Sequence, residues 1–130
     1  MIIPPGVQKI GPESGSDPWK GVSINNIAAN GRPFGSEFTV SADRIAFVTY
    51  SIDMNIPSKS GGQATITASV DGKFVAGSRN TEIVSSGDEV SIQRREVFSF
   101  FVPAGSAVTL GRSLTTGVTV ALAGGQEVIF

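Results

Sequence analysis

Side chains that could carry out catalysis are few in this sequence of 130 residues. It contains no histidine and no cysteine, so it has neither a Ser-His-Asp nor a Cys-His arrangement and no imidazole or thiolate metal ligand. The one Ser–Lys combination is Ser58, Lys59 and Ser60, beside two glycines. A loop of that kind lacks the dry surroundings that lower the pKa of a lysine. We therefore expect a protein that is not an enzyme and that uses no cofactor.

The acidic residues do not form an evident site either. A glycosidase needs two carboxylates facing each other across a cleft, whereas most acidic residues here stand singly. Asp53 and Asn55 share one face of a predicted strand, and Asp88 and Glu89 adjoin in a predicted turn. Neither pair approaches the oxygen density of a calcium-binding loop. A solvated strand face and a turn explain both pairs, so we expect no metal site.

Charge and hydropathy exclude two further classes of partner. The chain has 10 basic and 11 acidic residues, and of the basic ones only Arg94 and Arg95 are adjacent. Without a basic stripe we expect no nucleic-acid partner. No apolar run approaches the roughly 20 residues that span a bilayer, so we expect no membrane insertion. The first five residues lack a charged segment followed by a long apolar one, which predicts no signal peptide.

Alternating hydrophobicity from residue 36 onward predicts β-strands, and abundant glycine with little leucine, lysine or glutamate disfavours helices. The longest alternation covers residues 44–56, with one apolar face: Ala46, Val48, Tyr50, Ile52, Met54 and Ile56. Ile45 and Phe47 make the opposite face apolar at the start, so we expect this end to be buried on both faces. Asp71 and Gly72 predict a two-residue type I′ hairpin turn.

The densest aromatic run, at residues 98–101, predicts a strand that begins after the charges at 94–96 and ends at a Pro-Ala-Gly turn. The chain then returns along residues 107–110, so we expect a hydrophobic hairpin. Further strands are predicted at residues 22–27, 37–40, 63–70, 73–78, 81–85, 89–94, 118–122 and 127–130, with a turn at 123–125. Many short segments of this kind predict an all-β fold with roughly eight or nine strands, an antiparallel β-sandwich of jelly-roll type. An immunoglobulin-like sandwich is the second choice.

The first 35 residues differ from the rest, because five prolines and six glycines leave room for only one short strand. We expect an extended N-terminal arm over residues 1–35 and a single sandwich domain over residues 36–130. The arm carries apolar residues that could anchor it: Ile2, Ile3, Val7, Ile10, Trp19, Val22 and Ile24. Two alternatives are open. The arm either folds over its own sandwich or lies on a neighbouring subunit or larger particle.

The segment Phe101-Val102-Pro103-Ala104-Gly105-Ser106-Ala107-Val108-Thr109-Leu110 resembles a hairpin of small β-sandwich domains in bacteriophage tail fibres and virion appendages. Val108 stands where those domains often have tyrosine. The Thr/Ser/Gly/Val-rich, cysteine-free composition and the extended arm are also similar to virion proteins. The resemblance implies a homotrimer whose late strands pack between subunits.

We therefore expect a non-enzymatic virion structural protein, either a capsid-decoration protein or a component of a tail fibre or appendage. Its partners would be itself, as a trimer, and other virion proteins, after assembly in the host cytoplasm. The alternative is a β-sandwich module for host attachment that binds a carbohydrate or receptor, such as a host surface glycan. It would use loops at residues 57–62, 85–88 and 123–126, with these candidate ligand-binding residues: Lys59, Gln63, Asp88 and Gln126.

Overall fold

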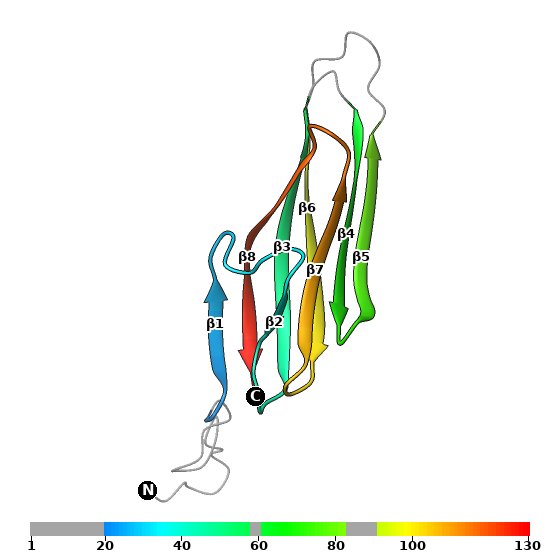
Figure 1. Ribbon diagram of the computed structural model, residues 1–130. Helices are drawn as coiled ribbons and strands as arrows, with labels where there is room; N and C mark the ends of the chain where they lie inside the picture. Colours follow the sequence, from blue (N-terminus) through cyan, green and yellow to red (C-terminus); the bar gives the residue numbers. More distant parts are fainter. Residues whose placement is uncertain (1–19, 58–60, 83–90) are drawn as a thin grey trace, which may run out of the picture.

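The structure of the protein is a computed structural model, which describes residues 20–57, 61–82 and 91–130. In these residues the chain forms eight strands and no helix (Figure 1). The strands are β1 (Ser23–Ile27), β2 (Glu37–Thr39), β3 (Ala46–Ile56), β4 (Gly62–Val70), β5 (Lys73–Glu82), β6 (Ile92–Val102), β7 (Ala107–Leu114) and β8 (Thr119–Ile129). The predicted all-β class is confirmed.

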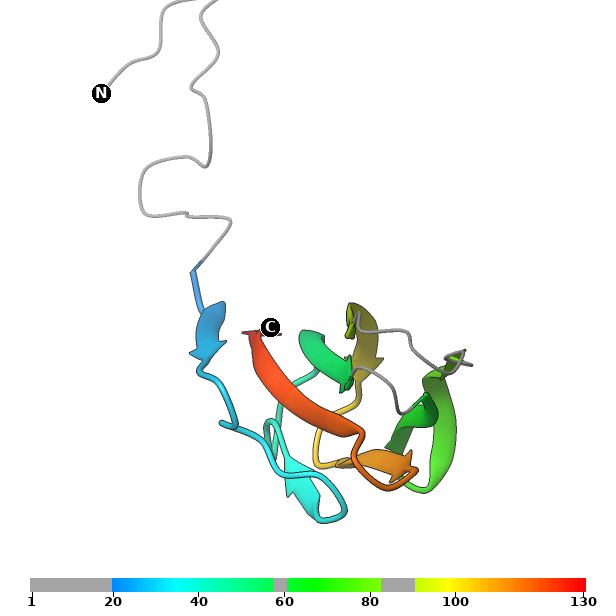
Figure 2. The same ribbon diagram turned by 90° about the horizontal axis from the view of Figure 1, so that it is seen from above.

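The strands form two four-stranded antiparallel sheets that face each other (Figure 2). The first sheet has the order β1-β8-β3-β6, and the second has the order β2-β7-β4-β5. Four pairs are nested along the chain, β1 with β8, β2 with β7, β3 with β6 and β4 with β5. The pairs β3–β8 and β4–β7 join these into the two sheets. The chain is therefore a β-sandwich.

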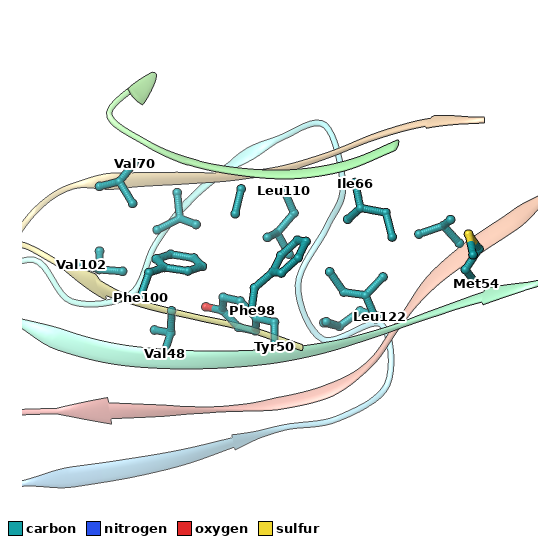
Figure 3. Close-up of a cluster of buried hydrophobic side chains, with 14 of the residues drawn as sticks. Val48, Tyr50, Met54, Ile66, Val70, Phe98, Phe100, Val102, Leu110 and Leu122 are labelled. Carbon is teal, nitrogen blue, oxygen red and sulfur yellow. The ribbon is translucent and has the colours of Figure 1, made fainter. Parts of the chain in front are cut away.

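The core lies between the sheets and follows the alternation predicted from the sequence. Along β3, every residue predicted to face inward is buried, including Tyr50 and Ile52. Figure 3 shows Val48, Tyr50 and Met54 of β3 in one cluster with side chains of the other strands, among them Ile66, Leu110 and Leu122. Each large aliphatic side chain buried in this way contributes about 1.5–3 kcal/mol to folding.

The hairpin predicted at Asp71 and Gly72 is confirmed. β4 and β5 pair on either side of it, and φ is positive at both residues, 51° and 78°. The Asp71 carboxylate accepts a hydrogen bond from the Ala107 N–H at 2.9 Å, and the Asp71 N–H donates to the Ala107 carbonyl at 2.8 Å. The first of these bonds lowers the pKa of Asp71 below its ordinary value. The turn thereby holds the start of β7 in place.

The hairpin predicted over residues 98–110 is wrong. The chain does turn after Pro103, with Gly105 at a φ of 73°. However, β6 pairs with β3 in the first sheet, while β7 pairs with β2 and β4 in the second. The segment that carries the resemblance to phage domains is thus a connection between sheets. Turn residues fix where a chain reverses, but they do not fix which strand it then joins.

Three predicted strand boundaries are also absent. β5 continues through residues 79–80, and β6 continues through the charged residues 94–96. Polar side chains do not interrupt the strands there, because these positions are exposed or lie at a sheet edge. The turn predicted at residues 123–125 lies inside β8, at a β-bulge where the register against β3 shifts between Ser51 and Ile52. A Cβ on Gly125 would lie 2.6 Å from the Thr49 carbonyl oxygen. The glycine there permits close backbone approach within a strand.

The described part of the predicted arm belongs to the sandwich. β1 pairs with β8 at the edge of the first sheet, and Ile27 and Phe34 pack against the core. Of the predicted anchors, Val22 is half-buried and Ile24 is exposed. Residues 20–35 therefore lie on their own subunit. The other predicted anchors lie outside the described residues: Ile2, Ile3, Val7, Ile10 and Trp19.

Candidate functional site

The outer face of the first sheet carries an apolar row at one end. Register places four apolar side chains side by side across all four strands: Ile24 on β1, Val128 on β8, Phe47 on β3 and Phe101 on β6. The rings of Phe47 and Phe101 are in contact, with centroids 4.9 Å apart. The row lies at the lower end of Figure 1, where β1 begins and β8 ends.

Two more apolar side chains extend this row. Ile45 precedes β3 and Phe130 follows β8, and the Phe130 N–H donates to the Ile45 carbonyl at 2.9 Å. Together the six residues form what we call the apolar patch: Ile24, Ile45, Phe47, Phe101, Val128 and Phe130. Phe101 is 61% exposed and Ile24 is 52% exposed. The patch is therefore open to solvent in the part of the chain that the structure describes.

The apolar patch corrects a prediction. The start of the long strand was expected to be buried on both faces, but Ile45 is 47% exposed and Phe47 is only half-buried. An apolar residue pattern shows which surface favours contact with other apolar groups. It does not show whether the same subunit provides the contact.

At the opposite end of the same face is a polar hollow of about 460 Å³. Its lining is mainly polar: Asp53, Met54, Asn55, Gln93, Arg94, Arg95, Thr119 and Ala121. Arg95 donates to both carboxylate oxygens of Asp53, from Nε at 2.6 Å and from Nη2 at 3.0 Å. These hydrogen bonds lower the pKa of Asp53. The hollow thus presents amide, hydroxyl and paired charged groups to solvent.

On the inner side of the first sheet, a buried carboxylate is paired with a half-buried arginine. The fully buried carboxylate of Glu127 accepts hydrogen bonds from Arg32, from Nε at 2.9 Å and from Nη2 at 2.6 Å. The Tyr50 hydroxyl donates to the same carboxylate at 2.5 Å. Burial, followed by these contacts with Glu127, raises the pKa of Tyr50. The Arg32 guanidinium also lies over the Phe38 ring, 4.7 Å from its centroid. This cluster fixes the connection between β1 and β2 to the sandwich.

This cluster could not be predicted from the sequence pattern because of the β-bulge in β8. Val118, Val120 and Leu122 face the core, so unbroken alternation would place Glu127 on the outer face. The extra residue at the bulge reverses the alternation, and Glu127 is buried instead. The same reversal turns Val128 outward into the apolar patch. Gly124 and Gly125 were the only sequence signal, because glycine within a strand often marks a bulge.

The candidate ligand-binding residues do not form one site. Gln63 lies in β4, which agrees with the strand predicted at residues 63–70, whereas Gln126 lies in β8 and not in the predicted loop at residues 123–126. The strands belong to different sheets, and each side chain points to the outer face of its own sheet, as the buried Ala64 and Glu127 beside them show. The two glutamines are therefore on opposite faces. Lys59 and Asp88 lie outside the described residues.

Neither metal ligation nor a spanning helix is evident in the described ranges. Residues 20–57, 61–82 and 91–130 contain no group of three His, Cys, Asp or Glu side chains able to hold a metal ion. No helix long and apolar enough to cross a membrane occurs in them.

Comparison with known proteins adds no family. The sequence matches no protein-family model and no curated protein.

Proposed function

We propose that this protein is a non-enzymatic structural protein of a virion and that it acts by self-association. The observation that carries the proposal is the apolar patch, which gathers exposed and half-buried apolar side chains from every strand of one sheet. Contiguous apolar surface of this kind marks sites of protein–protein contact. In an assembly, its burial would remove the apolar area from water at about 25 cal/mol per Å².

The strand order supports the virion part of the proposal. Four antiparallel pairs nested along the chain, folded into two sheets, are the arrangement expected of a jelly roll. Capsid domains are among the proteins that use this architecture, and lectin domains also use it. A shared fold does not assign a function by itself, so the proposal depends mainly on the apolar patch.

The proposed assembly is a homotrimer that docks on other virion proteins, as a capsid-decoration protein or a tail-fibre or appendage component. In a cyclic trimer each subunit binds one neighbour through one surface and the other neighbour through a second surface. No interface is then left without a partner.

Light scattering on a size-exclusion column tests the proposed self-association. At micromolar concentration we expect a particle of three times the 13.5 kDa subunit mass, falling toward the subunit mass on dilution. A folded protein with the subunit mass at every concentration would contradict the proposal.

A second candidate, host attachment through a saccharide, rests on the polar hollow. Its volume lies in the range of small-ligand sites, and the amides of Asn55 and Gln93 both donate and accept hydrogen bonds, as sugar hydroxyls require. The measurement is a glycan array probed with wild type and two variants. If the hollow binds sugar, Gln93→Ala loses the signal, and Gln126→Ala, on the same face but outside the hollow, retains it. If the wild type gave no binding signal on any glycan, the result would count against this candidate.

A further inference from the structure

We infer that the apolar patch of one subunit receives residues 1–19 of the next subunit. The inference rests on the proposed self-association and identifies residues 1–19 as the segment that forms the contact between subunits. Three observations support it: where the described chain begins, what residues 1–19 are made of, and how far they reach.

The described chain begins at the edge of the apolar patch. β1 starts opposite the end of β8, with Ser23 paired to Ile129. Arg44 holds the residues before β1 next to the residue after β8, since its guanidinium donates to the carbonyl oxygens of both Gly21 and Phe130. The described chain therefore begins close to Phe130, which is a member of the patch.

Residues 1–19 have the chemistry to cover an apolar surface. Their first eight residues carry no charged side chain, and the segment holds Ile2, Ile3, Val7, Ile10 and Trp19. The patch that they would meet is itself built only of Ile, Val and Phe side chains. Both surfaces thus expose apolar area to water when they are separate, and contact between them removes that area from water.

The length of residues 1–19 favours the patch of a neighbouring subunit over the subunit's own patch. Pro4, Pro5, Pro12 and Pro18 favour extended backbone, in which 19 residues span about 60 Å. The patch crosses four strands, a width of about 15 Å, and the 11 residues of β3 measure only about 36 Å. An extended segment of this length that started at the patch would carry Ile2 and Ile3 past its own sheet. Passing each segment to the next subunit closes a ring, as the proposed trimer requires.

Engineered cysteines in the full chain test this inference, and the absence of natural cysteine makes the readout clean. Two double variants combine Ile45→Cys, in the apolar patch, with either Ile3→Cys or Val7→Cys. Two controls pair the same arm positions with Val97→Cys. Val97 is similarly exposed on the outer face of β6, but it lies outside the patch, opposite Ser51. After oxidation, non-reducing gels separate monomers from covalent oligomers.

We expect at least one Ile45 variant to give covalent dimers and trimers in roughly tenfold higher yield than its Val97 control. A disulfide formed within one chain would overturn the inference, since the segment would then cover its own patch. Equal yields for the Ile45 and Val97 variants would also overturn it. Light scattering of the same samples under reducing conditions separates the two proposals. Oligomers without specific cross-links contradict only the docking segment, whereas monomers contradict self-association as well.

Discussion

Replacing Arg32 with methionine should cost about 3–5 kcal/mol of the free energy of unfolding, measured by urea denaturation. Methionine keeps much of the arginine stem, so apolar packing near the Phe38 ring is largely preserved. What is lost is the cation that donates twice to the fully buried carboxylate of Glu127. Tyr50 would then be the remaining side-chain donor to that carboxylate. A buried charge without its counter-ion is among the most destabilising changes known in proteins.

The matched control is Arg95→Met, which breaks the other bidentate Arg–carboxylate pair in the described structure. Arg95 and Asp53 have similar bond lengths to the buried pair, but their side chains are 60% and 48% exposed. Water screens such a pair, so we expect little change in the urea midpoint. Equal effects of the two substitutions would show that burial of Glu127 does not govern the stability of this fold.

Deleting residues 1–35 should unfold the sandwich or destabilise it by at least as much as Arg32→Met. The deletion removes β1 with its ladder to β8, the Arg32 partner of Glu127, and Phe34, which packs against the core. This result would differ from the expectation, based on sequence alone, that residues 1–35 form an arm separate from the domain. Circular dichroism and urea denaturation measure the effect.

Deleting only residues 1–19 provides the comparison. The eight strands of the described residues pair with one another and enclose the described core, so the shorter chain should remain folded with little loss of stability. If both deletions left the protein equally stable, β1 and Arg32 would not contribute to the fold as described. If both unfolded it, residues 1–19 would be part of the structural core.

The local features of the fold were predictable from the sequence, because short-range chemistry determines them. Period-2 alternation identified β3 and its buried face. Asp71 and Gly72 specified the β4–β5 hairpin, since a type I′ turn needs positive φ at both positions. Likewise, Pro103 and Gly105 marked the reversal after β6.

Features that depend on distant parts of the chain were not predictable in the same way. The assignment of β6 and β7 to different sheets depends on β3 and β4, which lie earlier in the sequence. The bulge in β8 reverses its alternation, so the buried position of Glu127 could not be read from periodicity. Two members of the apolar patch, Ile45 and Phe47, were expected to be buried for a related reason. Side-chain polarity shows that Ile45, Phe47 and Phe101 favour burial, but not which subunit covers them.

Sedimentation equilibrium of wild type, Phe101→Ser and Val97→Ser tests most directly whether the protein works through this surface. Both substituted residues are exposed apolar side chains on the outer face of β6, and only Phe101 belongs to the apolar patch. We expect Phe101→Ser to weaken self-association roughly tenfold or more, since burying one such side chain is worth about 1.5–3 kcal/mol. Val97→Ser should associate like wild type. An unchanged association constant for Phe101→Ser, in a wild type that does associate, would contradict the proposed role of the apolar patch.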